Sequence, residues 1–195
     1  MHVAETSQSD WRSGLCEDAR DVLYRIAQDA LVACVEHPDQ AFDWGIYAIA
    51  PALRREMASF VTLHLLDGRL RGCIGTLEPV APLFRSVHDN TVAAALQDPR
   101  FQPVQAAELP LIRLTVSILS PPSPIAKVEH FIPGEHGIIL EKHGRRSVFL
   151  PEVAAEQGWT RNETLAALCV KAGLPGDAWQ AEAHFSIFHS AVLSG

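Results

Sequence analysis

Residues 59–76 read SFVTLHLLDGRLRGCIGT, and this stretch decides the fold. Its first part, 59–66, is rich in β-branched and apolar residues, a composition typical of strands. The pair Asp67-Gly68 follows, which suits the positive φ angles of a type I′ turn. The segment 69–76 is therefore predicted to return as the second strand of a hairpin.

The returning strand carries residue types suited to chemistry. Side chains alternate along a strand, so Arg71 and Cys73 are expected on the same face. Gly72 and Gly75 leave the backbone open to a close neighbour, and Thr76 completes the group of candidate binding residues. Because a nearby cation favours the nucleophilic thiolate, Arg71 is expected either to activate Cys73 or to hold an anion.

A structural interpretation of the same residues stays open. Free cysteine is among the most buried residue types, so Cys73 also fits as a small apolar residue inside a sheet. Gly72 and Gly75 would then allow a helix to pack tightly over the strand. Residue types alone favour this interpretation, and the arginine beside the cysteine argues against it.

Hydrophobic periodicity predicts the elements on either side of the hairpin. Apolar residues recur at three- and four-residue spacing over 16–35, which indicates an amphipathic helix. Pro82 begins a second helix that continues through Leu96. Residues 112–119 alternate between apolar and other side chains, so they are predicted to form a strand.

The carboxy-terminal half predicts more strands and one capped helix. A second hairpin is expected at 137–150, turning at His143-Gly144. Thr160 is a good helix cap, and the helix after it is expected to end at Ala172. A last strand over 183–192 is predicted to complete the sheet.

Length and charge bound the class of protein. With 195 residues, 48% of them hydrophobic, the chain is long enough for one domain, which we expect to have two lobes. A formal net charge of -7 without a concentrated basic patch argues against nucleic acid as a partner. A local pocket for one phosphate is compatible with this charge.

Location and cofactors follow from what the sequence contains. It has no apolar run of the roughly 20 residues that cross a bilayer, so no membrane association is expected and a cytoplasmic location is predicted. Residues 1–14 are polar and expected to be a flexible segment, with the domain over 15–195. The four cysteines show no CxxC spacing, which predicts reduced thiols without a disulfide framework or a zinc site. No motif predicts a cofactor held by this chain.

A loop motif, Asp98-Pro99-Arg100-Phe101, supplies further candidate site residues. Arg100 and Phe101 are suited to present a cation and an aromatic face to an anionic or planar ligand. The alternative is a structural turn in which Asp98 caps backbone amides, Arg100 pairs with a carboxylate and Phe101 fills the core.

Glu152 and two histidines are weighed as further partners of Cys73. Glu152 follows a helix-initiating proline, where it complements the helix dipole, and its functional alternative is a general base. His64, on the other strand of the hairpin, and His88, on the next helix, are competent metal ligands beside a thiolate. No second histidine follows His88 at one-turn spacing, so no metal site is predicted.

Several of these motifs together resemble the AMMECR family. The hexapeptide at 70–75, LRGCIG, looks like the signature of that family. Other pieces follow in the expected order: FVTL at 60–63, DPRF at 98–101, EL at 108–109, VSIL at 116–119, HGI at 136–138 and LPEVA at 150–154. The resemblance extends from about residue 15 to the last strand.

This resemblance implies a fold and a functional context. Members are similar to a compact α+β unit, with an antiparallel β-sheet flanked by helices and a smaller subdomain beside it. The family is associated with a Memo-like protein and a radical SAM protein, to which any iron or S-adenosylmethionine would belong. The resemblance therefore implies a catalytic or substrate-handling component with Cys73 at its site. The arginines Arg71 and Arg100 add the expectation of a small anionic ligand. The alternative is a non-catalytic scaffold that binds those two proteins.

Overall fold

The computed structural model describes residues 11–195, which form two compact units. Unit 1 runs to Leu119 and includes Ala191–Gly195, whereas unit 2 is Ser120–Ser190. Each has its own four-stranded sheet and its own apolar core. Most of the predicted flexible segment lies outside the described residues. Its last four residues, 11–14, form a turn in which Arg55 donates to the carbonyl oxygens of Trp11 and Ser13.

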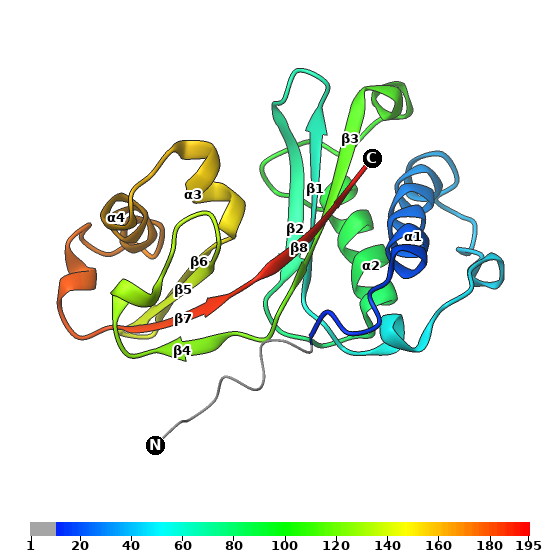
Figure 1. Cartoon of the computed structure of the whole chain (residues 1–195). Helices are drawn as coiled ribbons and strands as arrows, with labels where there is room; N and C mark the ends of the chain where they lie inside the picture. Colours follow the sequence, from blue (N-terminus) through cyan, green and yellow to red (C-terminus); the bar gives the residue numbers. More distant parts are fainter. Residues whose placement is uncertain (1–10) are drawn as a thin grey trace. The chain divides into compact units, whose positions relative to one another are not determined.

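The sheet of unit 1 has the predicted hairpin at one edge (Figure 1). Its strands are β1 (Ser59–Leu65), β2 (Leu70–Thr76), β3 (Ile112–Leu119) and β8 (Ser190–Ser194), in the order β2-β1-β3-β8. β1 is antiparallel to both β2 and β3. Since β2 has a strand on one side only, its other edge needs partners for its backbone groups.

Two helices cover one face of this sheet, α1 (Glu17–Glu36) and α2 (Leu83–Leu96), as Figure 1 shows. Val61 and Leu63 of β1 face them and are fully buried. Both helices and β3 lie where the periodicity of the sequence predicted them, so these three predictions are confirmed. Three 3-10 helices lie in the connections, at Trp44–Ile46, Pro51–Arg54 and Ala106–Leu111. No helix among the described residues combines the length and the apolar character that crossing a membrane requires.

The first hairpin turns differently from the prediction. A type I′ turn needs a positive φ at both Asp67 and Gly68. Gly68 has one, at 85°, but Asp67 does not, since His143 is the one non-glycine residue with a positive φ in the described chain. Leu65 accepts from the Gly68 amide at 2.9 Å and donates to the Arg69 carbonyl at 2.8 Å. This is a three-residue loop that ends in a left-handed glycine, so the predicted type I′ turn is wrong.

Unit 2 contains the other sheet, in the order β4-β7-β5-β6. Its strands are β4 (Ser123–Ile125), β5 (Gly137–Lys142), β6 (Arg145–Phe149) and β7 (His184–Phe188). The helices are α3 (Pro151–Gln157) and α4 (Arg161–Lys171), with 3-10 turns at Val128–His130 and Ala178–Gln180. Leu165 and Leu168 of α4 pack with Ile138 and Leu140 of β5 in its core.

Two predictions in this unit have different outcomes. His143 and Gly144 have φ angles of 52° and 70°, which confirms a hairpin that turns at this pair. The predicted strand over 183–192 is wrong as one strand, because β7 and β8 belong to different sheets. They are separated at His189, whose amide and carbonyl both bond to Ser120. The α+β fold class is confirmed, with two sheets.

Gly72 gives a test of how tightly α2 packs on the hairpin. A Cβ atom at Gly72 would collide with the carbonyl oxygen of Ala94, whereas one at Gly176 would make only ordinary contacts, the nearest at 3.8 Å. We expect Gly72→Ala to lower the free energy of unfolding by about 2 kcal/mol, a typical cost of overpacking. Gly176→Ala is the matched control. Equal stability of the two variants in urea unfolding would show that α2 does not need Gly72.

Candidate functional site

The free edge of β2 is bound at Cys73 by two side chains from the loop after α2. The amide of Cys73 donates to Asp98 Oδ2 at 2.8 Å, and Arg100 Nη2 donates to the Cys73 carbonyl at 3.2 Å. These are the two bonds that a neighbouring strand would otherwise provide. Asp98 and Arg100 therefore position the central residue of the hexapeptide.

Asp98 is a buried carboxylate whose oxygens are well satisfied. Its side chain is 2% exposed, and Arg100 donates to it through Nη2 at 2.7 Å, Nε at 2.9 Å and the backbone amide at 3.1 Å. The hydrogen bond from the Arg100 guanidinium is the main reason why the pKa of Asp98 lies well below its usual range. Asp98 therefore stays ionised, and Arg100 stays charged, at neutral pH.

The thiol of Cys73 has two polar neighbours. Thr62, directly opposite on β1, donates its hydroxyl to Cys73 Sγ at 3.3 Å. The pKa of Arg100 is raised chiefly by its hydrogen bond to Asp98, and the Cys73 side chain adds to this increase. Cys73 and Thr62 are both half-buried and project from the sheet face opposite to α2. A hydroxyl donor and a cation are both groups that stabilise a thiolate.

Arg71 is bound elsewhere and is not the cation beside the thiol. The register changes from Leu63↔Gly72 to His64↔Leu70, so Arg71 is the extra residue of a β-bulge. Its Nε and Nη2 donate to the two carboxylate oxygens of Glu108 at 2.7 and 2.9 Å. This bidentate pair raises the pKa of Arg71 and lowers that of Glu108.

Phe101 is close to both arginines of the site. The guanidinium carbons of Arg71 and Arg100 are 5.9 and 5.4 Å from the centre of its ring, within the range of cation–π contacts. Arg71 is only 11% exposed, whereas Arg100 is 53% exposed. Of the two cations, Arg100 is therefore the one that a ligand from solvent can reach.

The small residues of the hexapeptide are in contact with the protein itself. α2 packs against Gly72, and the ring of Phe60 lies against the position of a Gly75 side chain. Thr76 accepts from the amide of Glu78 and donates to its carbonyl, which holds the turn after β2. These contacts give all three residues a structural role, and their assignment as binding residues stays a prediction.

Glu152 belongs to unit 2, whereas Cys73 belongs to unit 1. Ser190 donates to Glu152 Oε1 at 2.7 Å, so this carboxylate already has a structural partner. A general-base role for Glu152 stays a prediction.

The histidines considered as metal ligands lie in other surroundings. His64 pairs with Leu70 across the hairpin, and Thr62 takes the place opposite Cys73. His88 packs against the rings of Phe42 and Trp44, at 4.6 and 5.0 Å between centroids. Neither contact brings a metal ligand to Cys73.

Over residues 11–195, one group of side chains has the spacing of a metal site: Glu135, His136 and His189. The amide of Ile132 donates to His136 Nδ1 at 3.1 Å, so a neutral ring carries its proton on Nε2, the nitrogen nearer to Glu135. A protonated Nε2 cannot bind a metal. The group therefore fits a hydrogen-bonded histidine better than a ligand set.

Two site residues were missed at the level of sequence, Thr62 and Glu108. Both fall within segments that resemble the AMMECR family, FVTL and EL, yet neither was assigned a role. The hairpin itself could have identified Thr62, because a two-residue turn at 67–68 places it opposite Cys73. Glu108 lies 37 residues from Arg71, and no local pattern links them.

A family model and two archaeal proteins are similar in sequence to this chain. A family model described as AMMECR1 matches residues 24–193. Protein NEQ441 of Nanoarchaeum equitans is 38% identical over 137 residues, which are 67% of this chain and 76% of that protein. A protein of Aeropyrum pernix is 39% identical over 170 residues, 83% of this chain and 72% of that one.

A solved structure is also similar. The crystal structure of the uncharacterized protein PH0010 from Pyrococcus horikoshii matches with a TM-score of 0.83 and 31% sequence identity. The match covers 90% of each chain. The fold described above is therefore shared with that archaeal protein.

Asp98→Asn tests whether the bonds at Cys73 stabilise unit 1. We expect a loss of about 2 kcal/mol in unfolding free energy at pH 7, because a hydrogen-bonded charge is removed from a buried position. The folded pKa is depressed, so this stabilisation is complete above the unfolded value of about 4 and is lost as the pH falls below it. The difference from the unmodified chain should therefore shrink in urea unfolding at pH 3.

Asp67→Asn is the control for that measurement. Asp67 also binds the arginine two residues later, through Arg69 Nε at 2.8 Å, but in the solvent. Little change is expected there. An equal loss in both variants would contradict a special role for Asp98.

The lowered pKa of His136 predicts that its contribution to the stability of the fold is lost in acid. Burial lowers its pKa and neighbouring His189 lowers it further, against smaller opposite effects of Glu135 and the His130 backbone. Because the unfolded chain binds this proton more readily, stability is complete above about pH 6.5 and falls as the solution is acidified. His136→Asn keeps an acceptor for the Ile132 amide. Its melting temperature should fall less than that of the unmodified chain when the pH is lowered from 7.5 to 5.5. The exposed His37→Asn is the control, and parallel loss in all three chains would refute the assignment.

Proposed function

The chain belongs to the AMMECR1 family, and on that premise we propose that it handles a substrate through the thiol of Cys73. In this proposal it works in the cytoplasm, as one component beside a Memo-like protein and a radical SAM protein. The association with these two proteins rests on the family resemblance of the motifs. The role of Cys73 rests on the geometry of unit 1.

The observation that carries the proposal is the position of two side chains at Cys73, the hydroxyl of Thr62 at its sulfur and the guanidinium of Arg100 at its carbonyl. Thr62 donates to Sγ at 3.3 Å, and Cys73 in turn contributes to the raised pKa of Arg100. The thiolate is the reactive form of cysteine, and reactive cysteines in general lie beside hydrogen-bond donors and cations. In this proposal Cys73 is the nucleophile, and Arg100 takes the role that the sequence suggested for Arg71.

The proposed chemistry is nucleophilic attack by the Cys73 thiol on the substrate. The thiol loses its proton to water, and the sulfur electron pair forms a bond to an electrophilic carbon of the substrate. The leaving group departs with the electrons of the bond that breaks. Arg100, half-exposed beside Phe101, favours a substrate that is small and anionic.

Thr62→Val tests this assignment against a matched change. Loss of the hydroxyl donor should slow alkylation of Cys73 by iodoacetamide at pH 7 by roughly three- to fivefold, as expected for one hydrogen bond. Thr115 lies directly beside Thr62 on β3, on the same face of the sheet. Thr115→Val makes the same change one strand further from the thiol and should leave the rate unaltered.

Either of two results would contradict the assignment. Alkylation of Cys73 in Thr62→Val could equal that in the unmodified chain, or Thr115→Val could slow it as much. The rate of each variant is measured by peptide mass spectrometry on folded protein.

A second candidate function is a non-catalytic scaffold for the same two proteins. It is favoured by the extent to which the motif is bonded internally: Arg71 to Glu108, Arg100 to Asp98, and α2 against Gly72. Cys73→Ser separates the two candidates, since a scaffold retains its full effect on partner activity. Under the first proposal, the serine variant still binds the partners but supports no turnover.

A further inference from the structure

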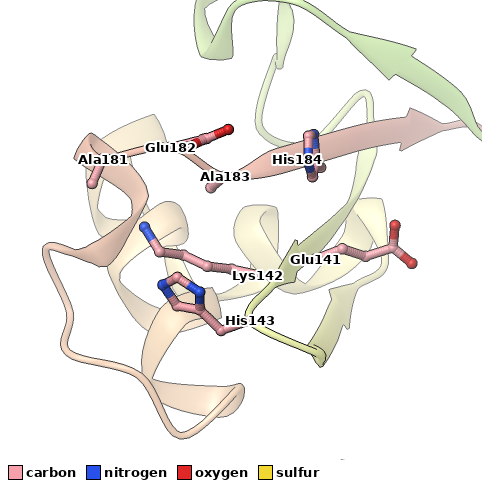
Figure 2. A pocket seen from close by; sticks show the side chains of 7 residues that line it. All are labelled: Glu141, Lys142, His143, Ala181, Glu182, Ala183 and His184. Carbon is pink, nitrogen blue, oxygen red and sulfur yellow. The ribbon is translucent and has the colours of Figure 1, made fainter.

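Unit 2 has a hollow at the tip of the hairpin formed by β5 and β6, distant in sequence from Cys73. It has a volume of about 380 Å³ and lies between Lys142 and His143 on one side and residues 181–184 on the other (Figure 2). A second hollow, of about 350 Å³, adjoins it along the same hairpin and includes Arg145 and Arg146. We call the first one the β5–β6 hollow.

The hairpin beside this hollow is rich in positive charge. Lys142, Arg145 and Arg146 place three of the 16 lysines and arginines of the chain within five positions, although the net charge is -7. Arg146 lies 3.3 Å from Glu141, which neutralises that carboxylate. Lys142 and Arg145 donate instead to backbone carbonyls, those of Ala178 and Ala172. Glu182 is the other carboxylate that lines the hollow.

Lys142 is positioned as a donor before any ligand arrives. Its ammonium donates to the carbonyl of Ala178 at 2.9 Å, which uses one of its three hydrogens. The side chain is half-buried, so little conformational freedom remains to be lost on binding. Two hydrogens are left for a ligand in the hollow, which Lys142 lines.

His143 lies next to Lys142 in a fixed turn. Its φ of 52° and the φ of 70° at Gly144 define a tight hairpin turn, which holds the exposed imidazole at the rim. In Figure 2 the carboxylates of Glu141 and Glu182 point away from the ammonium of Lys142. The methyl groups of Ala181 and Ala183 line the other wall.

We propose that the β5–β6 hollow binds the phosphoryl group of a small molecule, with Lys142 and His143 as its donors. An ammonium is a compact charge with rotatable donors, which suits a tetrahedral phosphoryl group. The planar fork of a guanidinium, which favours bidentate carboxylates, is directed away here, since Arg145 donates to the carbonyls of Ala172 and Gly173. The small alanine side chains leave room for the remainder of the ligand.

The test is a titration of the full chain with inorganic pyrophosphate, followed by amide NMR. Shift changes are expected at 142–145 and 181–183. Lys142→Met keeps the aliphatic stem and removes the charge, and it should weaken binding roughly tenfold, the usual effect of one charge-assisted hydrogen bond. Lys127→Met, an exposed lysine of the same unit outside the hollow, should bind as the unmodified chain does.

Three results would overturn the proposal: no shift changes at these residues, unchanged affinity in Lys142→Met, or citrate bound as tightly as pyrophosphate. The last would show a general anion patch with no preference for phosphoryl groups. The proposal does not depend on the function proposed for Cys73, which lies in unit 1. Each can therefore fail without the other.

Discussion

The interaction on which the candidate site depends is the ion pair between Asp98 and Arg100 at the free edge of β2. An edge strand exposes backbone groups that another chain can pair with. Here the carboxylate accepts the Cys73 amide and the guanidinium binds the Cys73 carbonyl, so both groups are satisfied within the unit. The same two side chains thereby fix the position of the thiol and place a cation beside it.

Two irregularities in the first hairpin compensate for each other. The three-residue loop shifts the pairing of the strands by one position, so that Leu65 bonds to Arg69. The bulge at Arg71 shifts it back, and Thr62 comes to lie opposite Cys73. As a consequence Arg71 leaves the ladder and pairs with Glu108, and Arg100 is the arginine that binds Cys73.

Local patterns predict much of this fold, because they are set by neighbours in the sequence. The helices, β3 and the turn at His143-Gly144 all follow from periodicity, caps and turn residues. The division of the last strand into β7 and β8 depends on bonds between His189 and Ser120, 69 residues apart, which no local rule contains. Sequence motifs likewise identified Cys73, Asp98 and Arg100 as candidates. They did not predict which arginine lies at Cys73, because that depends on a single bulge.

The most direct test of the account compares the four cysteines of the native chain in one alkylation experiment. Burial raises the pKa of Cys34 to about 11 and also raises that of Cys169, so both should react slowly with iodoacetamide. Cys16 is exposed and serves as the reference. The account predicts that Cys73, although half-buried, reacts at least as fast as Cys16. A Cys73 that reacts as slowly as Cys34 and Cys169 would contradict it.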